Sequence, residues 1–381
     1  MEIQRRRDLV HTDQRGRRSG SGAGHEMLYY ASLHCPLQPA LLHPQTIINF
    51  YLVEVVIIGQ FLVQWVIIRR AKARSSAMPR RLFMPAPSSK RYFVTGATGF
   101  LGSFLVRRLI CEGHDVSVMV RDPQSASSRE LMTLLPTLHI VQGDLDNLDP
   151  LGDVLREMRP DAILHLAWNG IDALARNSTG QLIQNVQSTL TLLDLCRSSG
   201  CPVFAGFGSQ AEYGIADGVL HEDSPCRPIT AYGVAKHALS ELALKFGEIT
   251  STRVLWFRIF SAYGPHDHPN HLLPSLITSM LRGTCPPLTA GEQTWDYLYA
   301  EDAVKGILAA LNAVDACGIF NLASGQQYSL RHVIESVRDL VDSSIHLKFG
   351  ELPYRRDQVM MLAGSVDRLR DATGWRPEVS L

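Results

Sequence analysis

The chain has 381 residues, enough for one large α/β domain or two smaller ones with a well-buried core. Hydrophobic residues make up 45% and charged residues 19%, as in ordinary globular proteins, and 37 basic residues balance 37 acidic ones, which argues against nucleic-acid binding. The 7 cysteines are scattered without a C-x-x-C pair, as is typical of reduced thiols in a cytosol-like compartment.

The N-terminal part differs from the rest of the chain. Residues 1–45 begin with an Arg- and Gly/Ser-rich stretch and are predicted to be disordered. Residues 46–68, TIINFYLVEVVIIGQFLVQWVII, have the length of a membrane-spanning helix, and the basic flank RRAKAR suits a cytoplasmic end. Glu54 inside this segment weighs against insertion, because a central Glu costs about 2–3 kcal/mol on insertion scales.

Three interpretations of residues 46–68 stay open. The segment is a single-pass anchor of a cytoplasmic catalytic domain, an amphipathic helix that binds a partner, or an upstream stretch absent from a working protein that starts at Met78 or Met84. Residues 69–90, rich in Ser, Pro, Ala and Arg, are interpreted as a linker.

From residue 91 onward, apolar strands alternate with helical patterns. The first two strand candidates lie in RYFVTGATGFLGSFLVRRLICEGHDVSVMVRD (91–122), one before the glycine turn and one, DVSVMV, after the helix. The strand candidates that follow them are 138–142, 161–167, 202–207 and 253–260. Nearly continuous apolar strands separated by helices predict an α/β fold, a Rossmann-type doubly wound parallel sheet covered on both faces. The domain is predicted to span 91–260, and residues 261–381 are expected to form mainly a smaller substrate-binding lobe.

The stretch TGATGFLG is predicted to bind the phosphates of a dinucleotide. It joins the first strand to the first helix, and its glycines allow a tight turn, a close approach of backbone N–H groups to pyrophosphate, and close packing of helix and strand. The helix N-terminus adds partial positive charge. The predicted contact residues in this turn are Gly96, Thr98, Gly99, Phe100, Leu101 and Gly102.

The choice between NAD and NADP depends on the end of the second strand. No acidic residue closes this strand to hold the ribose 2′-OH; Arg121 follows it and could bind a 2′-phosphate, which favours NADP. In the other interpretation Arg121 is a solvated charge and Asp122 binds the ribose of NAD. Asp144 and Leu145, after the third strand, are expected near the adenine ring.

Tyr232 and Lys236 in AYGVAK are spaced i,i+4, which places both on one face of a helix. A neighbouring ammonium is expected to lower the pKa of the tyrosine, so that the phenol exchanges a proton with a sugar hydroxyl or carbonyl. Ser209, at the end of the preceding strand, could hydrogen-bond the reacting oxygen. These three residues are the predicted catalytic set.

Together these motifs resemble the extended short-chain dehydrogenase/reductase family, in particular its nucleotide-sugar epimerases, dehydratases and ketoreductases. The similarity covers about residues 91–377 and is carried in order by VTGATGFLG, GDLDN, HLAW, NVQSTLTLLDLC, GSQAEYG, AYGVAK, RIFSAYGP, WDYLYAEDAVKGIL, IFNLASG and ATGWRP. The resemblance implies that Ser209, Tyr232 and Lys236 form the catalytic triad and that Lys236 also binds the nicotinamide ribose.

The resemblance also implies further contacts. Leu166 and Ala167 would line the cofactor cleft, and Asn185 would support the active-site helix. Arg258 and Tyr263 would border the substrate or cofactor pocket, and Arg356 would meet the phosphates of a sugar nucleotide. A homodimer built on the helices near 180–198 and 230–249 is implied as well.

Two residues after Ser209 narrow the chemistry. Dehydratases of the family usually carry Asp and Glu there, whereas this chain has Gln210, expected beside the substrate, and Ala211, and neither side chain transfers a proton. Reduction of a nucleotide 4-keto-6-deoxyhexose is favoured, with a 4-epimerase that retains NAD as the alternative. A dinucleotide-binding sensor without catalysis is the remaining alternative.

Three other features of the sequence do not add to the predicted site. HDHPNH (266–271) has metal-like spacing, but no second ligand cluster accompanies it and no metal site is predicted. His165 is interpreted as a buried histidine rather than a base. Trp168 either stacks near the nicotinamide or fills the cleft.

Overall fold

The computed structural model describes residues 89–170, 175–355 and 358–381, within a compact unit that spans Pro85–Leu381. The predicted disordered segment, the apolar segment 46–68 and nearly all of the linker lie outside the described residues. In the described part of the chain no helix is long and apolar enough to cross a membrane.

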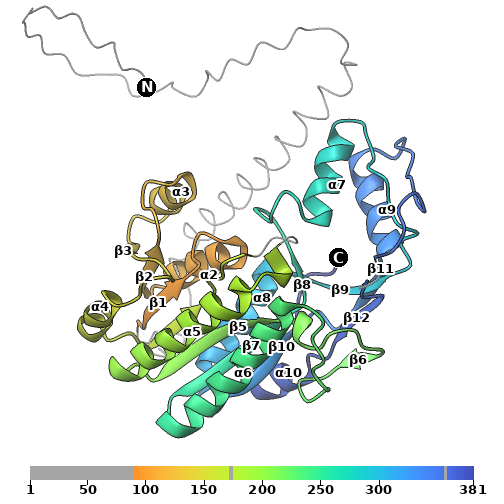
Figure 1. Ribbon diagram of the computed structural model, residues 1–381. Coiled ribbons are helices and arrows are strands. Elements are labelled where there is room, and N and C mark those ends of the chain that lie inside the picture. Colours follow the sequence, from red (N-terminus) through yellow and green to blue (C-terminus); the bar gives the residue numbers. More distant parts are fainter. Residues whose placement is uncertain (1–88, 171–174, 356–357) are drawn as a thin grey trace, which may run out of the picture. The chain divides into compact units, whose positions relative to one another are not determined.

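Seven parallel strands form the larger sheet, in the order β10-β7-β5-β4-β1-β2-β3 (Figure 1). The strand order reverses between β1 and β4, which is where open α/β sheets bind ligands. The strands are β1 (Arg91–Thr95), β2 (Asp115–Val120), β3 (His139–Gln142), β4 (Ala162–His165), β5 (Val203–Ser209), β7 (Arg253–Ile259) and β10 (Gly318–Leu322).

Helices cover both faces of this sheet. One apolar core joins it to α2, α8 and α10, and a second core joins the opposite face to α4, α5 and α6, of which α5 and α6 lie side by side (Figure 1). The helices are α2 (Phe100–Cys111), α4 (Leu151–Met158), α5 (Gly180–Ser198), α6 (Ala231–Thr250), α8 (Ala300–Asn312) and α10 (Asp367–Thr373), with α3 (Ala126–Leu134) packed beside the first core.

The strands other than the edge strand β3 are largely apolar because both of their faces are buried. In β1, Tyr92 and Val94 enter the first core while Phe93 enters the second. In β7, Phe257 enters the first core and Trp256 enters the second. Alternate side chains of a strand point to opposite faces, so a doubly covered strand has no polar face. The predicted fold class is confirmed.

A smaller lobe contains the second sheet, in the order β11-β9-β12-β6, with β8 paired to β9. The helices α7 and α9 pack together over their own apolar core. These elements are β6 (Val219–Leu220), β8 (Ser261–Tyr263), β9 (Thr294–Tyr299), β11 (Gln327–Ser329), β12 (Met361–Gly364), α7 (Leu272–Leu281) and α9 (Leu330–Val341).

The division into the two parts does not follow the chain at residue 260. Strand β10 and helix α8, from the predicted substrate-binding lobe, complete the large sheet and its cover. Conversely, β6 from the predicted dinucleotide-binding domain pairs with β12 in the small sheet. The boundary was unpredictable because strand pairing is a long-range property that local sequence patterns do not carry.

Candidate active site

The glycine turn after β1 fits tightly between two other segments. Gly96 has φ +77°, which favours glycine, and a Cβ there would lie 2.6 Å from the backbone nitrogen of Ala167. A Cβ on Gly102 would overlap the carbonyl oxygen of Gly96. The N–H of Gly99 donates to that same carbonyl at 3.0 Å. The glycines therefore bring α2, the turn and the end of β4 into contact.

This arrangement suits a pyrophosphate. Gly99 caps α2 without a side-chain hydrogen bond, and no acidic residue lies in the first turn, so no side chain neutralises the partial positive charge of this helix end. Thr98 and Gly99 are exposed and Phe100 is half-buried. The side chain of Leu101 belongs to the core, which leaves only its backbone for a ligand. The described turn thus fits the predicted dinucleotide.

The predicted adenosine-binding residues follow β2 and β3 at the same edge of the sheet. Arg121 is exposed, and its neighbour Asp122 accepts the N–H of Gln124 at 2.8 Å. Asp144 is half-buried, whereas the Leu145 side chain packs in the second core. An exposed guanidinium at this position stays available to a 2′-phosphate.

The residues after β4 are tied to the glycine turn. The N–H of Leu166 donates to the carbonyl of Thr95 at 3.1 Å, and the N–H of Ala167 donates to the Thr95 hydroxyl at 3.3 Å. Both residues are half-buried beside Gly96. Asn185, on α5, brackets the next loop residue, since its amide accepts the N–H of Asn169 at 2.8 Å and donates to its carbonyl at 3.0 Å.

The three predicted catalytic residues come together at the end of β5. Thr230 caps α6 by accepting the N–H of Gly233 at 3.0 Å, which starts the helix just before Tyr232. The Ser209 side chain lies close enough to the Tyr232 phenol to oppose the rise of its pKa. Nζ of Lys236 lies 5.9 Å from the Tyr232 ring centroid and donates to the carbonyl of Phe207 at 2.5 Å. Tyr232 therefore faces the serine, and Lys236 lies near the tyrosine ring.

The protonation of this set is governed by burial. Burial lowers the pKa of Lys236 to about 7, and the carboxylate of Glu212 opposes that shift. Burial also raises the pKa of Tyr232, and the nearby Ser209 side chain is the largest opposing cause. The predicted lowering of the tyrosine pKa by Lys236 is therefore wrong for this structure, because desolvation of the phenolate outweighs the neighbouring groups.

Ser209 is positioned by a buried carboxylate whose oxygens accept hydrogen bonds from the protein. Ser209 begins the short 3₁₀ turn η2 (Gln210–Glu212), and its N–H donates to Oε1 of Glu212 at 2.9 Å. Nε1 of Trp256 donates to the same oxygen at 3.1 Å, and Nε of Arg258 to Oε2 at 2.8 Å. Glu212 is fully buried, and both of its carboxylate oxygens accept hydrogen bonds from the protein. These oxygens are therefore not accessible to a substrate. A Cβ on Gly208 would overlap this carboxylate.

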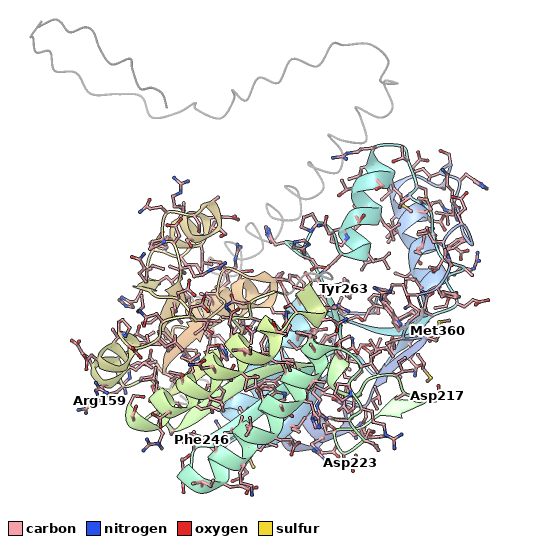
Figure 2. The ribbon with its side chains drawn as sticks, in the orientation of Figure 1. Arg159, Asp217, Asp223, Phe246, Tyr263 and Met360 are labelled. Carbon is pink, nitrogen blue, oxygen red and sulfur yellow. The ribbon has the colours of Figure 1, made fainter. Side chains whose placement is uncertain are left out.

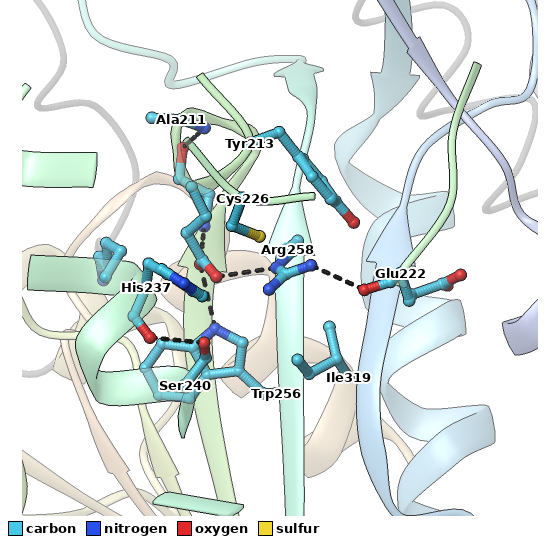
Figure 3. A network of polar contacts seen from close by, with 12 residues as sticks. Ala211, Tyr213, Glu222, Cys226, His237, Ser240, Trp256, Arg258 and Ile319 are labelled. Atoms are coloured by element: carbon cyan, nitrogen blue, oxygen red, sulfur yellow. Dashed lines mark hydrogen bonds and ion pairs between the residues drawn. The ribbon is translucent and has the colours of Figure 1, made fainter. Parts of the chain in front are cut away.

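Arg258 does not border a pocket, contrary to the prediction. Its side chain is 1% exposed, and Nη1 donates to the carbonyl of Glu222 at 3.0 Å (Figure 3). Its guanidinium also lies 4.5 Å from the ring centroid of Tyr213. Arg258 does lie in the predicted strand. A guanidinium that is buried inside the sheet must pair with a buried negative charge, and Glu212 supplies that charge.

The other predicted substrate contacts differ in their surroundings. Tyr263, labelled in Figure 2, is half-buried and packs against the rings of Tyr297 and Tyr299, with centroid separations of 6.4 and 5.6 Å. Gln210 is half-buried within η2, next to Ser209. Arg356 lies outside the described residues.

The signals that sequence analysis set aside have local partners. His165 is buried, bonds Thr95 at 2.7 Å and Thr189 at 3.0 Å, and burial lowers its pKa to about 3, so it is a neutral core histidine. In HDHPNH, His271 pairs with Asp267 at 2.8 Å. No group of His, Cys, Asp or Glu in the described part of the chain has the arrangement of a metal site.

The sequence analysis did not predict the hydrogen bond of Gln181 to Trp168 or the contact of the Glu212 carboxylate with Ser209. Gln181, in the first turn of α5, is 1% exposed and accepts the indole N–H of Trp168 at 2.6 Å. A glutamine near a helix start is common, so the sequence contained no signal for this role. Glu212 could have been suspected, because its spacing from Ser209 is that of a capping box.

Comparisons with known proteins identify the family of this chain. The model of the NAD dependent epimerase/dehydratase family matches residues 92–323. A UDP-glucose 4-epimerase of Corynebacterium glutamicum is 29% identical over 315 residues, which cover 76% of this chain and 91% of that protein. A GDP-6-deoxy-D-mannose reductase of Pseudomonas aeruginosa is 30% identical over 304 residues, which cover 77% of this chain and 94% of that protein.

A solved structure, MoeE5 in complex with UDP-glucose and NAD, matches with a TM-score of 0.65 and 28% identity, covering 76% of this chain and 94% of that one. These matches confirm the family resemblance inferred from the motifs, the enzyme class and a nicotinamide dinucleotide as the cofactor type.

Proposed function

Because this chain belongs to the NAD-dependent epimerase/dehydratase family, we propose that it transfers hydride at a ring carbon of a nucleotide-activated sugar, in the first place by reducing a 4-keto-6-deoxyhexose. The observation that carries this proposal is the cluster of Ser209, Tyr232 and Lys236 beside a glycine turn, without an available acid. The side chains of Gln210 and Ala211 cannot transfer protons, and Glu212 is buried in an ion pair with Arg258. Dehydration, which needs such an acid and base, is disfavoured.

The chain's own residues would perform the proton chemistry. When bound, the dinucleotide supplies or accepts the hydride. Tyr232 would donate its phenolic proton to the carbonyl oxygen that becomes a hydroxyl, and Ser209 would hold that oxygen by a hydrogen bond. Lys236 keeps two of its three N–H donors beyond the one given to Phe207, and these would serve a ribose hydroxyl. Gln210, Tyr263 and Arg356 are proposed to contact the nucleotide sugar.

The cofactor is proposed to be held by Gly96, Thr98, Gly99, Phe100, Leu101 and Gly102 at the pyrophosphate, mostly through the backbone. The exposed Arg121 supports NADP as the preferred form, since a free guanidinium suits a 2′-phosphate. Asp144, Leu145, Leu166 and Ala167 would complete the cleft.

A second candidate is 4-epimerisation with tightly bound NAD. It is supported by the similarity to the UDP-glucose 4-epimerase and to MoeE5 with NAD. Both reactions use the same tyrosine and the same hydride chemistry, and they differ in whether the cofactor leaves. A dinucleotide-binding sensor remains the third candidate, which the intact catalytic set argues against.

The experiment that separates these candidates begins with the full-length chain. Bound dinucleotide is released by denaturation and identified, and the emptied protein is titrated with NADPH and NADH. A site that is empty on purification and prefers NADPH, with consumption of NADPH on adding a nucleotide 4-keto-6-deoxyhexose, supports the reductase. Retained stoichiometric NAD with interconversion of UDP-glucose and its C4 epimer supports the epimerase. Failure to bind either dinucleotide would contradict both.

We also propose that two copies pair through α5 and α6. These adjacent helices expose a set of large apolar side chains to solvent: Leu182, Ile183, Leu190, Val234, Leu242 and Ile249. Such a patch on two long neighbouring helices suits a second copy, whose same helices would bury it. Light scattering on the full chain and on Ile183→Glu checks this, with a dimer expected for the first and a monomer for the second.

A further inference from the structure

Trp168 occupies a fixed place beside the catalytic set. It follows β4 in HLAW, is half-buried, and donates its indole N–H to Oε1 of Gln181 at 2.6 Å. The amide nitrogen of Gln181 donates in turn to the carbonyls of Gly170 at 2.5 Å and Ala175 at 3.1 Å. Because Gln181 is anchored on α5 and nearly fully buried, it sets the orientation of the indole.

In this orientation the indole contacts both members of the Tyr-x-x-x-Lys pair. Nζ of Lys236 lies 3.5 Å from the indole ring centroid, over its face. The ring of Tyr232 meets the indole edge-on, with a centroid separation of 5.6 Å and an interplanar angle of 85°. The face of an indole attracts a cation, and an edge-to-face arrangement is favourable for two aromatic rings.

The surroundings of Lys236 explain why such a contact matters. Lys236 is 6% exposed, and burial lowers the pKa of its ammonium group to about 7. The charged or titratable groups that face it are Glu212, which favours the ammonium, His165, which stays neutral, and Tyr232. The carbonyl of Phe207 accepts one N–H at 2.5 Å. The indole face therefore supplies attraction where solvent cannot.

We propose that Trp168 is a positioning residue, whose indole holds the charged Lys236 against the Phe207 carbonyl and fixes the ring of Tyr232. This role rests on the proposed function, because it acts through the residues assigned to proton transfer. Through Gln181 it also links their geometry to the loop that follows β4.

The test compares two variants of the full chain. Trp168→Phe keeps an aromatic face, whereas Trp168→Leu keeps only apolar volume. In Trp168→Leu the alkaline limb of the pH profile of kcat is expected to move to lower pH by about 0.5–1 unit, since a cation–π contact favours the ammonium by that order. Trp168→Phe should restore at least half of this shift. Gln181→Met, which removes the hydrogen bond but keeps packing, should give an intermediate shift.

A matched control is Trp295→Phe, because Trp295 also donates its indole N–H, to the carbonyl of Val359, but in the small sheet. It should leave the pH profile unmoved. An unmoved or upward-shifted alkaline limb in Trp168→Leu would overturn the proposal, as would equal shifts in the Phe and Leu variants.

A second readout separates this proposal from the proposed function. The pH dependence of chemical modification of Lys236 by a small amine-reactive reagent, followed by mass spectrometry of its peptide, needs no turnover. If the wild-type chain turns over no nucleotide sugar, the proposed function fails. The positioning role is then supported by a downward shift of the Lys236 titration in Trp168→Leu and overturned by its absence.

Discussion

Glu212 and Arg258 form an ion pair inside the protein although 46 residues separate them in the chain. Oε2 and Nε lie 2.8 Å apart, and the side chains are 0% and 1% exposed. Because Oε1 accepts the N–H of Ser209, this pair ties the predicted catalytic serine to β7. The same guanidinium donates to the carbonyl of Glu222 (Figure 3), a residue that follows strand β6 of the small sheet. The active-site turn and the second lobe thus share one buried charge network.

Glu212→Gln is expected to destabilise the protein strongly. The substitution leaves the Arg258 guanidinium buried without a counter-charge, and breaking such a pair costs about 3–5 kcal/mol. The free energy of unfolding in urea measures the effect. Glu248→Gln is the control, because it removes only the exposed pair with Lys245 and should change that free energy by less than about 1 kcal/mol. Equal effects of the two variants would contradict the assigned role of the buried pair.

Tyr232→Phe is expected to lower turnover by about 10²–10⁴-fold, the range for loss of a general acid or base. Binding of the dinucleotide should be retained, since the glycine turn is untouched. Steady-state kinetics and a cofactor titration measure the two effects. Tyr328→Phe, which removes a phenol bonded to Gln326, serves as the control and should keep full turnover. Retention of turnover in Tyr232→Phe would exclude this residue as the acid.

Gly102→Ala is expected to weaken dinucleotide binding by about tenfold or more. The new methyl group would overlap the carbonyl of Gly96, and relieving such an overlap typically costs about 1–3 kcal/mol. A titration with NADPH and NADH measures the loss. Gly113→Ala is a matched control: it has φ +84° and no atom near its Cβ position, so it should cost stability but not affinity. An unchanged affinity in Gly102→Ala would show that the turn does not bind the phosphates.

Lys236→Met is expected to stabilise the folded chain in a pH-dependent way. Burial lowers the pKa of Lys236 from 10.5 to about 7, so between these values the unfolded state binds the extra proton and stability rises with pH. The penalty for the buried ammonium is fully present below about pH 7 and disappears above about pH 10. The free energy of unfolding of the variant should therefore exceed that of the wild type by a few kcal/mol at about pH 6, on the scale of about 1.4 kcal/mol per pKa unit. At about pH 10 the two free energies should differ little. Urea unfolding at both values checks this, and a gap independent of pH would refute it.

The features that the sequence predicted are local in the chain. The glycine turn, the strand before it and the helix after it lie together within residues 91–111, and Tyr232 and Lys236 share one helical face by their spacing alone. Continuous apolar runs indicated the buried strands, because both faces of these strands are covered. These patterns predict the fold class, which the structure confirms, and a candidate cofactor site and catalytic set.

What only the tertiary structure decided concerns contacts between distant segments. Arg258 was expected at a pocket and lies in an ion pair, because its partner Glu212 is reached only once β5 and β7 are paired. The pKa of Tyr232 rises where a fall was predicted, since its burial depends on every element packed around α6. The place of Trp168 over Lys236 depends in the same way on Gln181 in α5. Burial and charge pairing are sums over neighbours in space, so a pattern along one chain predicts the residues of this site better than their electrostatic state.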